Sequence, residues 1–176
     1  MSESTTVLIS EEDLQKRIAD IGLQIRADIG DSPIVLLCVL KGAFPFLADL
    51  CRAIPGEVLV DFVQISSYAG EKSSTGVVQL KKDHEINIEG KHVVVVEDII
   101  DTGLTITHLR ELLMTRKPAS LRVAAVVNKF EARTHPAQVE YIGFDIPNRF
   151  VVGYGLDYKE RYRQLPYIAI LEGATE

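Results

Sequence analysis

Apolar residues recur along the chain with two different periods, and each period predicts a different kind of element. After Ser10-Glu11-Glu12-Asp13, which suits a helix N-cap and an acidic first turn, apolar residues return every three or four positions as far as Gly30. They are Leu14, Ile18, Ile21, Ile25 and Ile29. The next segment, 34–40, is almost continuously apolar, which is typical of a strand covered on both faces. The start of the chain therefore predicts a helix followed by a buried strand.

The same alternation continues to the end of the chain. The expected segments are a helix over about 43–52, a strand over 58–65, a buried strand over 92–96, a turn over 97–103, a helix before Pro118, a buried strand over 121–127, and further strands over 139–144, 150–154 and 167–171. The helix before Pro118 carries Ile106, Leu109, Leu112 and Leu113 on one face. Strands that alternate with helices predict an α/β fold with a mostly parallel central sheet flanked by helices. A length of 176 residues fits one domain.

One stretch, 66–76, has neither an apolar period nor an apolar anchor beyond Tyr68. Its residues are small, polar and glycine-containing, so we expect a mobile loop there. Loops of this length in compact domains tend to be functional.

Composition narrows the class of protein. The net charge of -6 argues against nonspecific binding to nucleic acid. No apolar run approaches the roughly 20 residues that span a bilayer, and the start Met1-Ser2-Glu3-Ser4 lacks a signal pattern. Cys38 and Cys51 suggest buried thiols rather than a disulfide framework, and the four histidines show no paired zinc-ligand spacing. We expect a cytoplasmic protein without nucleic-acid or membrane partners.

The segment after the apolar run 93–96 carries the densest chemistry. Glu97-Asp98 is followed by Ile99-Ile100 and then by Asp101-Thr102-Gly103-Leu104-Thr105, where a helix opens. Ligands of open α/β sheets bind at the carboxyl ends of strands, and free N–H groups at a helix N-terminus suit a phosphate. Gly103 allows a phosphate to approach the backbone, with the hydroxyl groups of Thr102 and Thr105 as further donors.

The acidic pair adds a second kind of site. Glu97 and Asp98 would repel a bare phosphate, but they can accept hydrogen bonds from ribose hydroxyls or bind magnesium. Asp101 or Thr102 could alternatively do no more than cap the helix. The acidic pair favours the ligand site, and one turn then serves both a phosphate and a sugar or metal.

This order of residues resembles the signature of the type I phosphoribosyltransferases: an apolar strand, two acidic residues, two apolar residues and Asp-Thr-Gly-x-Thr. The rest of the chain, from about 36 to 171, resembles the hypoxanthine-guanine phosphoribosyltransferases more closely. Lys41-Gly42 looks like their pyrophosphate loop, Ser67-Tyr68 like their closing lid, and Lys129 like the lysine that contacts the exocyclic oxygen of the purine. The stretch 150–158 is similar to the one that stacks on the base, and Arg163 follows at the spacing of a pyrophosphate-binding arginine.

The resemblance implies a purine-salvage enzyme that transfers the 5-phosphoribosyl group from phosphoribosyl pyrophosphate to hypoxanthine or guanine, giving IMP or GMP and pyrophosphate, with Mg²⁺ as cofactor. Asp101 would be the catalytic acid/base group. The other implied sites are the phosphoribosyl site (Glu97, Asp98, Asp101, Thr102, Gly103, Leu104, Thr105), the pyrophosphate site (Lys41, Gly42, Arg163), the purine site (Lys129, Phe150, Val151, Asp157) and the metal ligands (Glu97, Asp98, Asp157). It also implies a homodimer or homotetramer, and one domain, 1–176, with a core of about 31–145. A small hood would be built from the N-terminal segment and about 146–176.

Two positions depart from the family pattern. Leu104 stands where relatives often have lysine, and Asn148-Arg149 replaces the usual Asp-Lys before Phe150. The second change falls at the contact to the purine amino group, so fewer matched residues support guanine than hypoxanthine.

Two rival functions fit the pattern less well. A regulator that keeps the phosphoribosyl pyrophosphate site but binds nucleic acid would not need Lys41, Asp101, Lys129 and Asp157, and its charge would be more basic. A nicotinamide dehydrogenase would need Gly-x-Gly-x-x-Gly after a strand, and Gly153-Tyr154-Gly155 lacks the third glycine.

Overall fold

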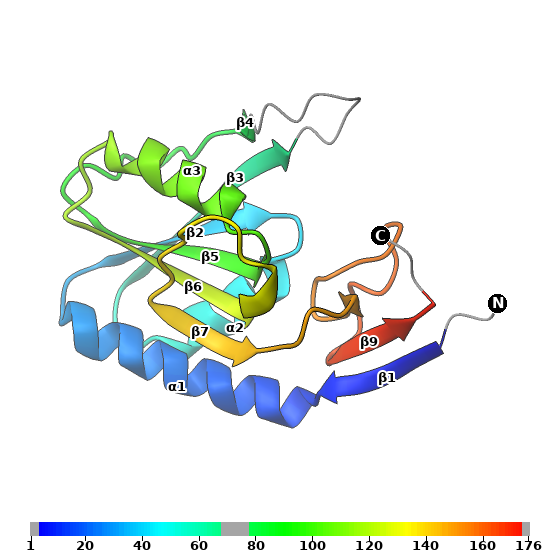
Figure 1. Ribbon diagram of the computed structural model, residues 1–176. Helices are drawn as coiled ribbons and strands as arrows, with labels where there is room; N and C mark the ends of the chain where they lie inside the picture. Colours follow the sequence, from blue (N-terminus) through cyan, green and yellow to red (C-terminus); the bar gives the residue numbers. More distant parts are fainter. Residues whose placement is uncertain (1–3, 68–77, 174–176) are drawn as a thin grey trace.

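A six-stranded sheet forms the centre of the molecule (Figure 1). The computed structural model describes residues 4–67 and 78–173. Its elements are β1 (Ser4–Ile9), α1 (Glu11–Ile29), β2 (Ile34–Leu40), α2 (Phe44–Ala53), β3 (Val58–Ser67), β4 (Val78–Lys82), β5 (His92–Ile100), α3 (Leu104–Met114), β6 (Ser120–Asn128), the short 3₁₀ helix η1 (Phe130–Ala132), β7 (Tyr141–Asp145), β8 (Val151–Val152) and β9 (Ile168–Glu172). The sheet has the order β4-β3-β2-β5-β6-β7, in which β4 is antiparallel to β3 and the other pairs are parallel. The predicted α/β class is confirmed.

The apolar runs of β2 and β5 are buried because helices cover both faces of the sheet. Alternate residues of a strand point to opposite faces. Leu36 and Val94 accordingly belong to one core cluster with α1 and α2, whereas Leu37 and Val95 belong to another with α3. Two packed layers hold the central strands, and the ends of these strands are therefore fixed in space.

Local signals set the limits of α1 as the sequence predicts. The Ser10 hydroxyl accepts a hydrogen bond from the Asp13 N–H (3.1 Å), which satisfies one of the free donors of the first turn. Gly30, with φ of 77°, donates its N–H to the Arg26 carbonyl and ends the helix. The Arg26 side chain then donates to the carbonyls of Gly30, Ser32 and Pro55. These hydrogen bonds fix the turn that connects α1 to β2.

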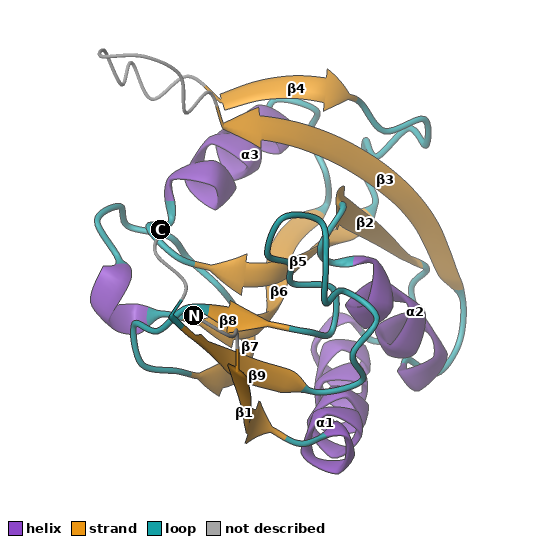
Figure 2. Ribbon diagram, turned by 90° about the vertical axis from the view of Figure 1, so that its right-hand side faces the viewer, coloured by secondary structure: helices purple, strands orange, loops and turns teal. Residues whose placement is uncertain are grey.

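A second sheet joins the two ends of the chain. It has three strands in the order β1-β9-β8, all antiparallel, and lies beside the carboxyl ends of the central strands (Figure 2). The N-terminal strand was not predicted, since its side chains are mostly exposed and it depends on pairing with β9, more than 150 residues away. No helix in the described part of the chain is long and apolar enough to cross a membrane.

Three sequence-based predictions require correction or remain open. The turn predicted over 97–103 is wrong in its first half, because β5 continues to Ile100: Glu97 pairs with Ala125, and Ile100 with Asn128, in the ladder with β6. Only 101–103 form the turn. Residues 66 and 67 of the predicted loop continue β3, and 68–76 lie outside the described residues.

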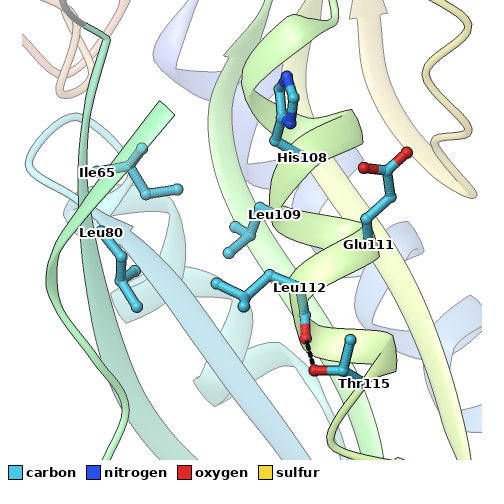
Figure 3. A pocket seen from close by; sticks show the side chains of 7 residues that line it. All are labelled: Ile65, Leu80, His108, Leu109, Glu111, Leu112 and Thr115. Atoms are coloured by element: carbon cyan, nitrogen blue, oxygen red, sulfur yellow. Dashed lines mark hydrogen bonds between the residues drawn. The ribbon is translucent and has the colours of Figure 1, made fainter. Parts of the chain in front are cut away.

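Leu112 is also not part of the buried face of α3, since it is 37% exposed. It lines a cavity of about 360 Å³ between α3 and the β3–β4 hairpin, together with Ile65, Leu80 and Leu109 (Figure 3). Because this cavity separates α3 from β3 and β4, the Leu112 side chain stays partly exposed to solvent.

Candidate active site

The carboxyl ends of the parallel strands meet at one edge of the central sheet, and the predicted site residues follow them. A cavity of about 420 Å³ at this edge is lined by Lys41 and Gly42 after β2, by Glu97 and Asp98 in β5, and by Asp157 and Arg163 from the C-terminal segment. Three segments far apart in sequence thus build one polar cavity. The predicted pyrophosphate and metal residues lie together here.

A second cavity of about 190 Å³ lies at the start of α3. It is lined by residues of the 101–103 turn together with Thr105, and it shares Glu97 and Thr105 with the larger cavity. The N-cap residue of α3 is Gly103, which has no side chain to cap the helix, and the Leu104 N–H donates to Thr102 Oγ1 at 3.4 Å. Because that hydrogen bond is long, the N–H groups of the first turn can still bind an anion.

Glycine is required at position 103 for two reasons. Its φ of 86° lies in the left-handed region, and an added Cβ would stand 2.9 Å from the His135 carbonyl oxygen and from Ala137 Cβ. The N–H groups of Thr134 and His135 both donate to the Thr102 carbonyl (3.0 Å), so the loop after η1 holds the turn in place.

The acidic pair sits in a poorly solvated part of the cavity. Burial, followed by the neighbouring Asp98 charge, raises the pKa of Glu97 well above its usual value, and within the described chain its Oε2 has no hydrogen-bond partner. Burial raises the pKa of Asp98 to about 6, against the lowering effects of the Ile99 N–H and Arg163. For both carboxyl groups, the cost of burying the charge therefore exceeds the stabilisation that neighbouring groups give to the charged form.

These residues fit a magnesium ion held partly by substrate and water. The described residues include no group of three or more His, Cys, Asp or Glu side chains arranged to hold a metal ion. Mg²⁺ in nucleotide enzymes commonly takes only one or two carboxylates, and water and phosphate oxygens fill the remaining positions. The unpartnered Glu97 oxygen, Asp98 and Asp157 are suitable oxygen donors for such a site.

Two glycines allow the cavity to form. A Cβ at Gly42 would lie 1.6 Å from Asp98 Oδ2, so the acidic pair can approach the loop only if residue 42 has no side chain. A Cβ at Gly155, where φ is 97°, would lie 1.8 Å from the Gly42 carbonyl oxygen. Gly42 was expected from the sequence to be a site residue, but Gly155 was not, because its role depends on a contact between segments more than 100 residues apart.

The predicted acid/base group and the predicted purine-reading lysine are neighbours. Lys129 is 4% exposed, and its Nζ lies 3.5 Å from Asp101 Oδ2. Its backbone N–H donates to the Ile100 carbonyl at the end of β5. A buried ammonium requires hydrogen-bond partners, and the Asp101 carboxylate lies within reach of this one.

The stretch that follows β7 places the predicted base-stacking residue at the small sheet. Phe150 is half-buried and meets the Tyr158 ring edge-on, with the centroids 5.5 Å apart. Val151 is buried in β8, and Arg149 pairs with Glu172 of β9 (3.1 Å). The described residues that line the two site cavities do not include Lys129, Phe150 or Val151.

Arg163 is the best-anchored cation of the site. Its NH1 donates to the Gly155 carbonyl (2.7 Å), and its NH2 lies 2.8 Å from Asp157 Oδ1. Lys41, after the cis peptide bond that joins it to Leu40, pairs with Glu160 (3.1 Å). Glu160 was not expected at the site, and its spacing of three residues from Arg163 is the signal that the sequence offers for it.

The predicted lid pair is only partly described. Ser67 is the last residue of β3, and its backbone pairs with Val78 of β4. Tyr68 lies outside the described residues. The assignment of Ser67-Tyr68 to a lid therefore stays a prediction.

Known proteins with the same arrangement identify the family. The sequence profile of the phosphoribosyl transferase domain matches residues 9–159. The chain is 42% identical to the hypoxanthine-guanine phosphoribosyltransferase of Bacillus subtilis over 169 residues, which cover 96% of this chain and 94% of that protein. It is 45% identical to the enzyme of the same name from Dictyostelium discoideum, with 96% of each chain covered.

Solved structures agree with the sequence relatives. A hypoxanthine-guanine phosphoribosyltransferase from Bacillus anthracis superposes with a TM-score of 0.90 at 47% identity, covering 94% of this chain and 97% of that one. A hypoxanthine phosphoribosyltransferase from Staphylococcus aureus gives a TM-score of 0.91 at 42% identity, covering 95% and 91%. The fold, the site and these likenesses together show that the chain belongs to the phosphoribosyltransferase family.

Proposed function

We propose that this protein is a purine-salvage enzyme that transfers the 5-phosphoribosyl group from phosphoribosyl pyrophosphate to hypoxanthine or guanine, releasing pyrophosphate and IMP or GMP. The observation that carries this proposal is the cavity at the carboxyl edge of the sheet, which joins Lys41 and Arg163 to the Glu97-Asp98 pair and to the start of α3. The names of the relatives support the same reaction.

The donor occupies both cavities in this proposal. Its 5-phosphate binds the N–H groups at the start of α3, with the hydroxyl groups of Thr102 and Thr105 beside it. Its ribose hydroxyls donate to Glu97 and Asp98, which satisfies carboxyl groups that are otherwise poorly solvated. The Leu104 N–H would exchange its long hydrogen bond to Thr102 Oγ1 (3.4 Å) for the phosphate, and the Leu104 side chain adds no charge.

The leaving pyrophosphate lies against Lys41, Gly42 and Arg163. Cations placed where negative charge develops stabilise the transition state, since they require no reorganisation during the reaction. Mg²⁺, held by Glu97, Asp98 or Asp157, would supply further neutralisation of the diphosphate charge. Glu97 and Asp98 also lie where positive charge would develop on the ribose ring.

The acceptor is a 6-oxopurine in this proposal. Asp101 takes the proton that the purine ring nitrogen loses as the new bond forms, and it is half-exposed to solvent at the turn. Lys129 donates a hydrogen bond to the 6-oxo group. The 6-amino group of adenine is also a donor, so it could not accept this hydrogen bond. Phe150 stacks on the base, while the backbone near Val151 and the Asp157 region read the far edge of the base.

A panel of bases tests this function. Hypoxanthine, guanine, xanthine and adenine are each incubated with phosphoribosyl pyrophosphate and Mg²⁺, and nucleotide formation is followed by ultraviolet absorbance. We expect turnover of hypoxanthine and guanine and none of adenine. Turnover of adenine at a rate comparable to hypoxanthine would overturn the role of Lys129, and the absence of turnover with every base would overturn the function.

Three further properties belong to the proposal by analogy with the family. The protein acts in the cytoplasm, as a homodimer or homotetramer, and its single domain divides into a core of about 31–145 and a hood. The separate three-stranded sheet β1-β9-β8, which joins the two ends of the chain, is the observation that supports the proposal of a hood. Light scattering of the purified protein, combined with size-exclusion chromatography, would measure the oligomeric state.

A further inference from the structure

The two cations proposed for pyrophosphate share one carboxylate of the protein itself. Lys41 Nζ lies 3.1 Å from Glu160 Oε2, although the two residues are 119 positions apart. Arg163 NH2 lies 3.4 Å from each of the two Glu160 oxygens. The carboxylate thus bridges a lysine after β2 and an arginine of the C-terminal segment, both of which line the larger cavity.

A narrow turn holds Glu160 in this place. Tyr158 and Arg161 exchange backbone hydrogen bonds (3.1 Å each), and Lys159 and Glu160 between them have φ values of 52° and 62°. The Glu160 N–H donates to Asp157 Oδ2 (2.9 Å), so the turn is also tied to the cavity wall. The geometry of the turn aims the side chain at Lys41 and Arg163.

A carboxylate and a phosphate compete for the same donors. Both present paired anionic oxygens to lysine and arginine, and charge-assisted hydrogen bonds to either have similar geometry. A solvent-exposed glutamate such as Glu160 is an anion at neutral pH, as the leaving group of the donor is.

The contact is also easily exchanged. The side chains of Lys41 and Glu160 are 58% and 66% exposed, and ion pairs this exposed contribute little to stability. Arg163, whose side chain is 19% exposed, also bonds to the Gly155 carbonyl and to Asp157, and neither bond involves the Glu160 side chain. A stronger anion can therefore displace Glu160 without dismantling the site.

We propose that Glu160 is an internal competitor for pyrophosphate, whose carboxylate occupies Lys41 and Arg163 in the free enzyme and yields them to the diphosphate of the donor. This inference rests on the proposed function, because it assumes that these cations bind pyrophosphate. A ligand that needs both cations binds only the molecules in which Glu160 has released them. Its apparent Kd therefore rises as that fraction of molecules falls. Glu160 would thus weaken the binding of both donor and product, and would promote the release of pyrophosphate by re-forming its own contacts.

The test compares pyrophosphate affinity between variants that remove the charge of residue 160 and variants that keep it. Glu160→Gln removes the competing charge, and Glu160→Asp keeps the charge but shortens its reach by one methylene. Glu85→Gln removes one charge from a comparable exposed pair, that of Glu85 with Lys82 (3.6 Å), and serves as the control. Calorimetric titration with pyrophosphate and Mg²⁺ gives Kd, and steady-state kinetics with hypoxanthine give KM for phosphoribosyl pyrophosphate.

For Glu160→Gln we expect both Kd and KM to fall about two- to fivefold, as displacement of an exposed ion pair allows. The KM for hypoxanthine should not change, Glu160→Asp should show a smaller fall, and Glu85→Gln should match the wild type. An unchanged or raised Kd in Glu160→Gln, with thermal stability retained, would overturn the inference. The equivalent fall in Glu85→Gln would overturn it too, since it would reveal a general charge effect. If the wild type itself forms no nucleotide, the proposed function fails; if only the Gln variant departs from expectation, this inference alone fails.

Discussion

The ammonium group of Lys129 lies 3.5 Å from Asp101 Oδ2, although the lysine side chain is 6% exposed and that of the aspartate 47%. The lysine reaches this position from the end of β6, and the aspartate from the turn after β5, which is the neighbouring strand. The pairing of the two strands thus brings a buried donor to a half-exposed carboxylate. In the proposed function, the proton acceptor and the group that contacts the purine oxygen would therefore meet the same base side by side.

Asp101→Asn should separate catalysis from donor binding. The amide keeps the size of the side chain and can still accept from Lys129, but it cannot take a proton. We expect kcat to fall by about 10²- to 10⁴-fold, the range typical of general acid–base catalysis, with KM for phosphoribosyl pyrophosphate little changed. Steady-state kinetics with hypoxanthine measure both constants. Asp31→Asn, at an exposed position after α1, is the control, and unchanged turnover in Asp101→Asn would refute the acid/base role.

Lys129→Gln should relax the choice of base. The glutamine carbonyl can accept a hydrogen bond from a 6-amino group, whereas the lysine can only donate. We expect kcat/KM for hypoxanthine to fall by about 10- to 100-fold, in line with the loss of a charged hydrogen bond, and the value for adenine to rise. Competition assays with both bases give the ratio directly. Lys16→Gln, on the exposed side of α1, should leave the ratio of kcat/KM for hypoxanthine to kcat/KM for adenine unchanged. If Lys129→Gln also kept the wild-type ratio, the assignment of Lys129 to the purine oxygen would be contradicted.

Gly42→Ala should impair the donor site through Asp98. The new methyl group would overlap Asp98 Oδ2, which lies 1.6 Å from the ideal Cβ position, and the carboxylate must move away. We expect KM for phosphoribosyl pyrophosphate to rise by about tenfold or more, because one misplaced contact commonly costs 1–3 kcal/mol. Gly90→Ala is a matched control, since Gly90 has φ of 70° but no atom near the added Cβ. It should lower stability alone; an equal effect of the two variants on KM would count against the role of Gly42.

Asp61→Asn should destabilise the fold outside the active site. Asp61, buried in β3, accepts the N–H groups of Phe62, Glu85 and Ile86 at 2.7 Å, and so fastens the chain after β4 to the sheet. An asparagine NH₂ group would face some of these donors. We expect the free energy of unfolding in urea at pH 7 to fall by about 1–3 kcal/mol. A loss below 0.5 kcal/mol, roughly the size of an ordinary surface substitution, would contradict this account.

The hydrogen bonds of Asp61 should also make the free energy of unfolding depend on pH. Burial raises the pKa of Asp61, but the three backbone hydrogen bonds outweigh it, and the net pKa lies below the usual 3.8. The carboxylate therefore stabilises the fold fully above that usual value, and its contribution is lost as pH falls through the lower folded-state pKa. The difference in stability between the wild type and Asp61→Asn should narrow as the pH drops below about 4. A constant difference between pH 5 and pH 2 would exclude this linkage.

Elements with local signals were predictable, and elements that depend on distant partners were not. Ser10 and Gly30 mark the ends of α1 within the sequence itself, and the run of β2 is apolar throughout. The side chains of β1 are mostly exposed, and β1 and β4 each pair with a strand on one side only, so their sequences carry little signal of their own. The end of β5 was misjudged because Glu97-Asp98 looked like the end of an apolar run, whereas pairing with β6 carries the strand on to Ile100.

The same distinction holds for the site. The turn proposed to bind phosphate is continuous in sequence, so residue types and spacing were enough to propose Asp101 to Thr105 as a site. Burial of Lys129 could not be foreseen, because its enclosure depends on strands and loops from elsewhere in the chain. Glu160 and Gly155 act through contacts with Lys41 and Gly42, more than 100 residues away, and became visible only in three dimensions.

In the proposed function, the residues around the cavity at the carboxyl edge of the sheet catalyse transfer of a phosphoribosyl group to a 6-oxopurine. The most direct measurement follows hypoxanthine, IMP and pyrophosphate together by chromatography, in one reaction with phosphoribosyl pyrophosphate and Mg²⁺. The account predicts that the protein forms IMP and pyrophosphate in equal amounts as hypoxanthine disappears, and that adenine in place of hypoxanthine gives no AMP. Folded protein that leaves hypoxanthine unchanged, or that forms pyrophosphate without IMP, would contradict it.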